Sequence, residues 1–436
     1  MIASLVLLAA PAIAPLSAVQ SGSIPPGYYD TVDTASQAAL RASLHAIIDD
    51  HTRFPYTSGS TDTWDILELA QQDPANTARI LDVYRNRSFT KQGGGNNLYN
   101  REHTWPTSLG FPDNDGSNMP FTDCHMLNLC DDGYNTSRSN KPFGQCTAGC
   151  SELVTDANGG AGGGSGAFPG NSNWFSGSFS SGTFQVNPIR RGDVARGLFY
   201  AAVRYEGGVH GITGVSEPDL MLTDNVGLIA ASNTGSNESF AYMGRLAVLL
   251  AWHLEDPVDA FETNRNNVVA AFQGNRNPFV DHPEWVECAF TGVCDPGGAY
   301  CSPNTPNSTG LPAMLTGVGS VAIADNDYRL VVSQLPPNQF GFFLGSRDMA
   351  FIPTPGGSQG DLCLGGEIGR VVGGQIVNSG FFGSFDVQPD LNALPQPNGP
   401  VQALAGETWH FQAWYRDLVL GFPTSNFTDA WAVTWQ

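Results

Sequence analysis

The chain has 436 residues, which predicts two or three domains, and its 41% apolar content lets each of them bury a core. The 51 glycines and 29 prolines favour loops and β structure and exclude an all-helical protein. A formal charge of −21, with only 20 Lys and Arg, argues against a protein that binds nucleic acid through a broad basic surface. An enzyme that holds one phosphate with a bound cation and a few local arginines is still compatible with this charge.

The first twenty residues, MIASLVLLAAPAIAPLSAVQ, are an apolar run with Ala at spaced positions. This pattern resembles a secretory signal peptide, predicted over 1–19, although its start lacks basic residues. The run is too short and too interrupted by Pro to span a membrane, and no later stretch is long enough. We therefore expect a secreted protein, either extracellular or periplasmic.

An even number of cysteines in an exported chain favours disulfides. Proximity predicts that Cys288 pairs with Cys294 and that Cys301 pairs with Cys363, with two further bridges among the first four cysteines. A zinc site made of Cys124, His125 and Cys130 is the weaker alternative, because a CxxC spacing is missing. The eight cysteines are Cys124, Cys130, Cys146, Cys150, Cys288, Cys294, Cys301 and Cys363.

Apolar residues recur at helical spacing in five segments before residue 296. The predicted helices cover 34–52, 75–85, 192–205, 241–257 and 258–272. The segment 157–183 is rich in Gly and Ser and is predicted to be an exposed, mobile loop. The helix at 241–257 is the most apolar and is expected to be buried.

The composition changes at about Asp295, where CDPGGAYCSPNTPNSTG reads as a linker. Short alternating runs such as YRLVVSQL, FGFFLGS and WHFQAWYRD follow, and Gly, Pro and Asn break them, as in a β-sandwich. We therefore predict an α+β protein, with a mostly α domain over 20–295 and an all-β domain over 296–436.

Residues 99–144 carry the residues best suited to chemistry, in YNREHTWPTSLGFP and TDCHMLNLCDDGYNTSRSNKPFG. An Arg-Glu-His triplet lies about thirty residues ahead of Asn135, Arg138 and Asn140. Carboxylate and amide oxygens suit a hard cation such as Mg²⁺, and a His can act as a general base near neutral pH. Together they could activate a water molecule against a phosphodiester.

Each of these residues also has a plainer interpretation. A Glu-His pair is common, and His103 taken alone would be interpreted as a packed or surface residue. At the end of a strand, however, Glu102 and His103 would point to opposite faces, so that one could bind a metal while the other faces substrate. Asn135 begins an Asn-Thr-Ser sequon, and a glycan there would exclude metal binding. Asn140 could equally form a turn.

Asp123 and His125 lie two residues apart, and hence on one face of a strand. They could orient His103 or a metal-bound water from behind. A structural hydrogen-bonded pair is an equally good interpretation.

NREHTWPTS followed by TDCHMLNL and YNTSRSN resembles the endonuclease I family of secreted nucleases, in the ββα-metal (His-Me finger) superfamily. The likeness continues through GDVARGLFYAAVRY and FQGNRNPFVDHPEW and covers about residues 27–288. It implies a mostly α nuclease domain built around a ββα-metal finger. His103 would be the general base, and Glu102 and Asn135 would hold one Mg²⁺, with Mn²⁺ or Ca²⁺ as alternatives. The products would be 5′-phosphorylated oligonucleotides from DNA, RNA or both.

The sequence departs from the family in two places. Some members carry a phosphate-binding Arg between the His and the second strand, yet 104–122 contains no Arg or Lys. We predict that Arg138 takes this role, with Arg101 or Arg196 as alternatives, whereas Arg276 is expected to be structural. Met126 stands where many relatives carry a second His or an Asn, which puts a supporting contact in doubt.

These features predict a secreted, metal-dependent, nonspecific endonuclease that acts as a monomer on DNA or RNA. The main rival is a non-catalytic exported protein with a relic nuclease fold, which binds carbohydrate or a cell surface. The C-terminal part resembles a small β domain of secreted bacterial proteins, and its tryptophans could line a carbohydrate surface or fill a core. They are Trp409, Trp414, Trp431 and Trp435. A phosphodiesterase acting on small nucleotides is the third alternative.

Overall fold

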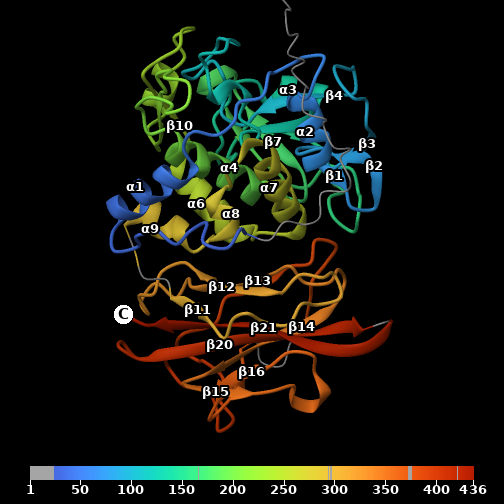
Figure 1. Ribbon diagram of the computed structural model, residues 1–436, viewed down its shortest axis with the longest axis vertical. Coiled ribbons are helices and arrows are strands. Elements are labelled where there is room, and N and C mark those ends of the chain that lie inside the picture. Colours follow the sequence, from blue (N-terminus) through green and yellow to red (C-terminus); the bar gives the residue numbers. More distant parts are fainter. Residues whose placement is uncertain (1–23, 165, 293, 295–296, 372–375, 420) are drawn as a thin grey trace, which may run out of the picture.

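The computed structural model describes residues 24–164, 166–292, 294, 297–371, 376–419 and 421–436. A helix-rich part comes first, and a strand-rich part follows from Gly298 onward (Figure 1). The predicted signal peptide over 1–19 lies outside the described residues. Within them, no helix has both the length and the apolar character needed to cross a membrane.

The helix-rich part is organised around α4, which is buried along nearly its whole length. It packs against α1, α6 and α8, and its Leu198 and Tyr200 lie in one large apolar cluster with Trp252 of α6. The helices are α1 (Gln37–Ile48), α2 (Thr63–Ala70), α3 (Asp132–Arg138), α4 (Arg191–Arg204), α5 (Val226–Ala231), α6 (Leu246–Glu255), α7 (Ala260–Gln273), α8 (Pro278–Asp281) and α9 (Trp285–Thr291). The predictions of helices within 34–52, 192–205 and 258–272 are confirmed.

Small sheets surround these helices. They are the antiparallel β1 (Gln72–Asp73), β2 (Asn76–Leu81) and β3 (Ser88–Thr90), the hairpin of β4 (Tyr99–His103) and β5 (Leu127–Asp131), the antiparallel β6 (Ser151–Leu153), β7 (Asn173–Ser176) and β8 (Thr183–Gln185), and the parallel pair β9 (Asp219–Leu222) and β10 (Phe240–Met243). The β4–β5 hairpin packs on α2 and α7 through one face, where Tyr99, Leu127 and Leu129 are buried with Trp64 and Val269.

Three of the predicted elements are wrong in part. The helix predicted over 75–85 is replaced by β2, because the Asp73 side chain accepts a hydrogen bond from Ala75 N (2.8 Å) in a turn and Ile80 and Leu81 then pair with β3. The segment 157–183 is not one loop, since it contains β7 with a buried Asn173. The 241–257 segment begins as β10, and α6 is buried only at Leu249, Trp252 and His253.

The strand-rich part is a sandwich of two packed sheets, as the alternating pattern predicts. Leu315, Leu330 and Val332 of the smaller sheet share a core with Phe343 and Phe411 of the larger one. The strand order is β12-β13-β19 in one sheet and β11-β21-β20-β14-β17 in the other, with β18 also on β14 and the ribbon β15–β16 outside. The strands are β11 (Gly298–Tyr300), β12 (Met314–Val318), β13 (Arg329–Ser333), β14 (Phe340–Ser346), β15 (Asp348–Ile352), β16 (Leu362–Gly365), β17 (Gly369–Arg370), β18 (Val377–Asn378), β19 (Phe385–Val387), β20 (Thr408–Val419) and β21 (Phe422–Thr434).

The core interpretation holds for most of the tryptophans of this part. Trp409, Trp431 and Trp435 are buried in the sandwich. Trp414 alone of the four is half-exposed, and it lies on the opposite face of β20 from the buried Ala413 and Tyr415.

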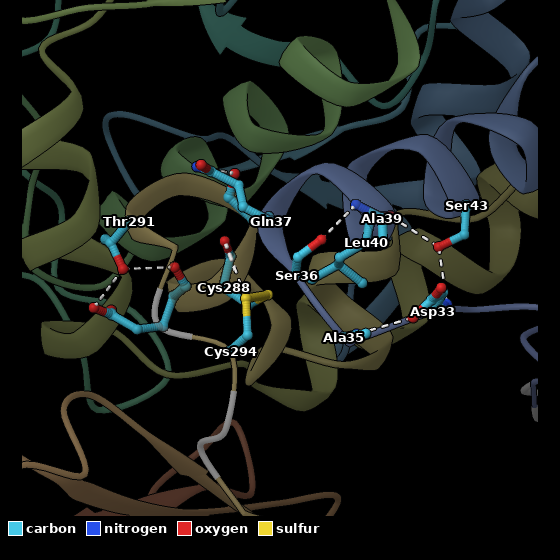
Figure 2. Close-up of a disulfide and its surroundings, with 12 residues drawn as sticks. Asp33, Ala35, Ser36, Gln37, Ala39, Leu40, Ser43, Cys288, Thr291 and Cys294 are labelled. Carbon is cyan, nitrogen blue, oxygen red and sulfur yellow. Dashed lines mark hydrogen bonds between the residues drawn. A yellow bond between two sulfur atoms is a disulfide. The ribbon is translucent and has the colours of Figure 1, made fainter.

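Disulfides join Cys288 to Cys294 and Cys301 to Cys363, as predicted, and Cys146 to Cys150. The expectation of two bridges among the first four cysteines is wrong, because Cys124 and Cys130 are reduced and lie in different apolar clusters. Figure 2 shows the Cys288–Cys294 disulfide near the N-terminal end of α1, where Gln37 donates to Ala289 O at 3.1 Å.

The two parts meet at the start of α7. Ala260 N donates to Phe382 O of the strand-rich part at 2.9 Å. The Arg190 guanidinium lies over the rings of Phe261 and Phe382, at 4.1 and 4.6 Å from their centres. Arg190 is 1% exposed and also pairs with the carboxylate of Asp259, the residue that caps α7.

Candidate active site

The residues of the 99–144 motif meet on a unit of two antiparallel strands and one helix. Glu102 of β4 lies opposite Asn128 of β5, and His103 lies opposite Leu127. The helix α3 begins directly after β5, where the Asp131 side chain accepts hydrogen bonds from the first free amides of the helix. Strand alternation sends Glu102 and His103 to opposite faces of the hairpin, as the sequence predicts.

His103 is held between two aromatic rings. Its imidazole stacks on Tyr56 with ring centres 5.7 Å apart, and it meets Phe121 edge-on at 4.9 Å. Nε2 lies 2.9 Å from Phe121 O, and a carbonyl only accepts, so Nε2 carries the proton. The Nδ1 lone pair therefore points away from that bond, and among the described residues it has no hydrogen-bond partner.

The electrostatic surroundings keep His103 neutral at neutral pH. Desolvation by its packed neighbours lowers the pKa of His103 to about 4, and nearby Arg101 and Arg138 act in the same direction. The hydrogen bond to Phe121 O opposes this shift only in part. A neutral imidazole with one free lone pair is the form that can accept a proton.

Glu102 is 2% exposed and is fixed from two sides. Its Oε1 accepts a hydrogen bond from the Tyr84 hydroxyl at 2.8 Å and lies 3.1 Å from Arg138 Nη1. Burial raises the pKa of Glu102, whereas Arg138 and the Tyr84 hydroxyl lower it. Within the described part of the chain, Oε2 has no hydrogen-bond partner, so one carboxylate oxygen is available to a ligand.

Asn135 and Arg138 occupy the same face of α3, one turn apart, and this face rests on β4. The Asn135 amide donates to Arg101 O at 3.4 Å, while Arg138 reaches Glu102. Asn135 is half-buried, and its Oδ1 has no hydrogen-bond partner among the described residues. The site thus presents two oxygen atoms, Glu102 Oε2 and Asn135 Oδ1, of the kind that Mg²⁺ prefers.

Arg138 is buried beneath the site, at 1% exposure. Its guanidinium donates to the backbone carbonyls of His103 (2.9 Å) and Thr104, and it lies 4.5 Å from the Phe143 ring. These contacts use the guanidinium to hold the end of β4 and the Glu102 carboxylate in place. The geometry favours positioning over the phosphate contact that the sequence suggests.

The other two arginines considered for the phosphate contact also have their guanidinium groups occupied by protein partners. Arg101 lies 3.3 Å from the centre of the Tyr56 ring and donates to Thr63. Arg196 is fully buried in a two-pronged pair with Glu262. Arg276 pairs with Asp281, which agrees with its expected structural role. Asn140 follows α3, is half-buried, and has no side-chain hydrogen bond within the described residues.

Asp123 and His125 turn away from His103 into the protein core. The Asp123 carboxylate accepts hydrogen bonds from Tyr200 (2.8 Å), Tyr205 (2.9 Å) and Gln273 (3.0 Å). The Nε2 of His125 lies 3.1 Å from a backbone carbonyl of the 274–277 turn. These contacts match the structural interpretation and join the segment before β5 to α4 and to α7 with the turn that follows it.

Three contributors to the site could not be recognised from the sequence. Tyr56 and Phe121 enclose His103, and Tyr84 holds Glu102. They lie 18 to 47 positions from the residue they contact, and none belongs to the Arg-Glu-His triplet or to the cluster of Asn135, Arg138 and Asn140. The tyrosine in FPYTS and the phenylalanine before TDCH are ordinary aromatic residues until the fold brings them together.

Comparison with known proteins identifies the chain. The pattern of the endonuclease I family matches residues 36–284, more than half of the chain. The chain belongs to the endonuclease I family. An extracellular ribonuclease of Bacillus amyloliquefaciens is 37% identical over 264 residues, which are 60% of this chain and 76% of that protein. An extracellular ribonuclease of Bacillus subtilis (strain 168) is 36% identical over 287 residues, 65% of this chain and 83% of that protein.

The family predicted from the 99–144 motif is therefore confirmed. The match to the endonuclease I family contains the β4–β5 hairpin, α3 and every candidate site residue between 101 and 140. It ends before the strand-rich part begins. The assignment to the ββα-metal superfamily and the individual residue roles stay predictions.

Proposed function

We propose that this chain is an exported, metal-dependent endonuclease that hydrolyses phosphodiester bonds of nucleic acid. One observation carries the proposal: a buried carboxylate with one free oxygen and a neutral imidazole with one free nitrogen stand on adjacent residues of β4. This pair lies within the family match, in the strand that also contacts Asn135.

His103 acts as the general base. Its Nδ1 accepts a proton from the attacking water, while the bond from Nε2 to Phe121 O holds the ring and favours the tautomer that leaves Nδ1 free. Tyr56 and Phe121 limit ring rotation and exclude water from the ring faces. The base thus starts from the unprotonated form across the neutral range.

Glu102 and Asn135 are the residues that would hold Mg²⁺, with Mn²⁺ or Ca²⁺ as alternatives, because they offer free oxygens on neighbouring elements. A bound divalent ion supplies charge stabilisation for the phosphorane-like transition state and the leaving oxygen. Tyr84 and Arg138 fix the Glu102 carboxylate before the ion binds. Arg138 is a positioning residue in this proposal, since its guanidinium is occupied by protein groups.

RNA is the substrate that the comparisons favour, because both relatives are named extracellular ribonucleases. Those names and the signal-like N-terminal run support export. Backbone recognition by the site would also admit DNA, since neither the imidazole nor the carboxylate reads a base.

Cleavage of unstructured RNA and of supercoiled plasmid with Mg²⁺, with and without EDTA, tests the proposal. His103→Ala should lower the rate by about 10²- to 10⁴-fold, as expected for removal of a general base. Glu102→Ala should abolish Mg²⁺ binding in calorimetry together with cleavage. His45→Ala is the matched control, because the Nδ1 of His45 lies 2.9 Å from Val203 O, on α1 outside the site. Full activity of His103→Ala would refute the mechanism.

A further inference from the structure

The outer face of the larger sheet in the strand-rich part carries a row of partly exposed aromatic rings. On β14, Phe340 and Phe342 alternate with the buried Phe343. Phe342 lies directly opposite Trp414 of β20, and the two rings stack with centres 4.9 Å apart at 27°. Phe340 is 48% exposed, and Phe342 and Trp414 are half-exposed.

Two unpaired arginines flank these rings. Arg370 of β17 places its guanidinium 4.0 Å from the centre of the Phe342 ring. Arg416 lies two residues beyond Trp414 on β20, hence on the same face. Both are exposed, and neither has a carboxylate partner in the described part of the chain.

The other two arginines of the strand-rich part are neutralised. Arg329 pairs with Asp386, and Arg347 pairs with Glu407 at 3.2 Å. From residue 296 onward the chain has four arginines against ten carboxylates. The unpaired positive charge of this acidic part is therefore concentrated at the aromatic rings.

We propose that Phe340, Phe342, Trp414, Arg370 and Arg416, here called the outer aromatic strip, bind single-stranded nucleic acid. Exposed rings on a sheet stack with unpaired bases, and guanidinium groups contact the phosphates between them. A neutral sugar polymer would also stack on the rings but would leave both arginines without a counter-charge, so the charge favours an anionic ligand. A duplex hides its base faces and would bind less well.

The strip lies away from the active site. The inner face of the same sheet packs on β12 and β13, which lie between it and the helix-rich part (Figure 1). Occupancy of the strip therefore leaves the β4–α3 site open. A long strand held at the strip raises the local concentration of cleavable phosphates, whereas a dinucleotide cannot reach both sites. The expected effect on cleavage rests on the proposed function, whereas binding of nucleic acid to the strip does not.

Fluorescence anisotropy of a labelled 20-nucleotide oligo(U) with the full-length His103→Ala chain, in EDTA, measures the binding while cleavage is suppressed. Trp414→Ala and Arg416→Glu, each added to this background, should weaken binding about tenfold, in line with the loss of one stacking or phosphate contact. Phe351→Ala is the matched control, because Phe351 is 66% exposed on β15 with no unpaired arginine described beside it. Arg416→Glu changes an exposed side chain, so this variant should fold normally, and weaker binding by it cannot be attributed to unfolding.

The same variants in the active chain separate this inference from the proposed function. We expect unchanged cleavage of a dinucleotide and an increase of about tenfold in KM for long RNA. Equal oligo(U) binding by Trp414→Ala, Arg416→Glu and Phe351→Ala would overturn the strip even if the enzyme cleaves RNA. The strip would also be overturned, in favour of a carbohydrate ligand, if Trp414→Ala and Arg416→Glu weakened binding to a neutral β-glucan but left oligo(U) binding unchanged. Absence of all cleavage by the wild-type chain would refute the proposed function without touching the binding result.

Discussion

Replacement of Arg138 by Met tests whether this arginine builds the site or contacts substrate. Arg138 and Glu102 are 1% and 2% exposed, and their charged groups lie 3.1 Å apart. Arg138→Met keeps most of the volume but leaves the Glu102 carboxylate buried with only the Tyr84 hydroxyl. Removing one member of a buried ion pair costs about 3–5 kcal/mol, so the free energy of unfolding should fall by that amount.

Urea denaturation followed by tryptophan fluorescence measures this loss, and a double variant isolates its cause. In Arg138→Met with Glu102→Gln no buried charge is left uncompensated, so most of the lost stability should return, whereas loss of the Glu102 carboxylate should abolish cleavage. Tyr84→Phe removes one hydrogen bond to the same carboxylate and should cost less, about 1.5–3 kcal/mol. An Arg138→Met chain with an unchanged urea midpoint and a raised KM would refute this reasoning and restore the phosphate role.

Three further predictions concern stability and thiols. Burial, with Asp193 nearby, raises the pKa of Asp259 to about 7, so this carboxyl binds a proton more tightly in the folded chain than in the unfolded chain. The Tm measured by calorimetry should therefore fall as the pH rises from 5 to 8. Asp259→Asn keeps a side chain that can cap α7 and should make the Tm less dependent on pH. Replacing Cys301 and Cys363 by Ser opens a loop of 62 residues and should cost about 4 kcal/mol in urea denaturation, whereas an unchanged midpoint would contradict this estimate. Thiol titration should find no reactive cysteine in the native chain and two after denaturation, Cys124 and Cys130; zero thiols in urea would contradict the structure.

Local signals in the sequence predicted much of the fold. The helix α1 follows from Leu40, Leu44 and Ile48 at four-residue spacing. Its cap, however, is Ser36 and not Thr34, where the predicted segment begins. The β-sandwich follows from alternating runs between Gly and Pro. The strand β2 was out of reach, because its pairing with β3 is tertiary and the apolar pair at its end fits a helix equally well.

The candidate site likewise combines residues that the sequence identifies with contacts that only the fold creates. Glu102, His103 and Asn135 stand in a motif, so their residue types point to a chemistry. The burial of Arg138 depends on how α3 rests on β4, and the partners of Asp123 come from α4 and α7, 77 to 150 residues later in the chain. Spacing along the chain does not determine which of these polar groups face solvent and which are buried and hydrogen-bonded in the core.

The contact at the start of α7 bears on how this protein can be divided. Ala260 N belongs to a helix terminus whose amides have no partner within the helix, and Phe382 of the other part supplies one. A fragment cut after the family match would leave this amide unbonded and uncover Phe261 and Arg190. The family match therefore stops short of one contact that α7 uses: Asp259 caps the helix from within the match, and Phe382 of the strand-rich part accepts the hydrogen bond of its first amide. A protein cut at the end of the match would lose part of the bonding at this helix terminus.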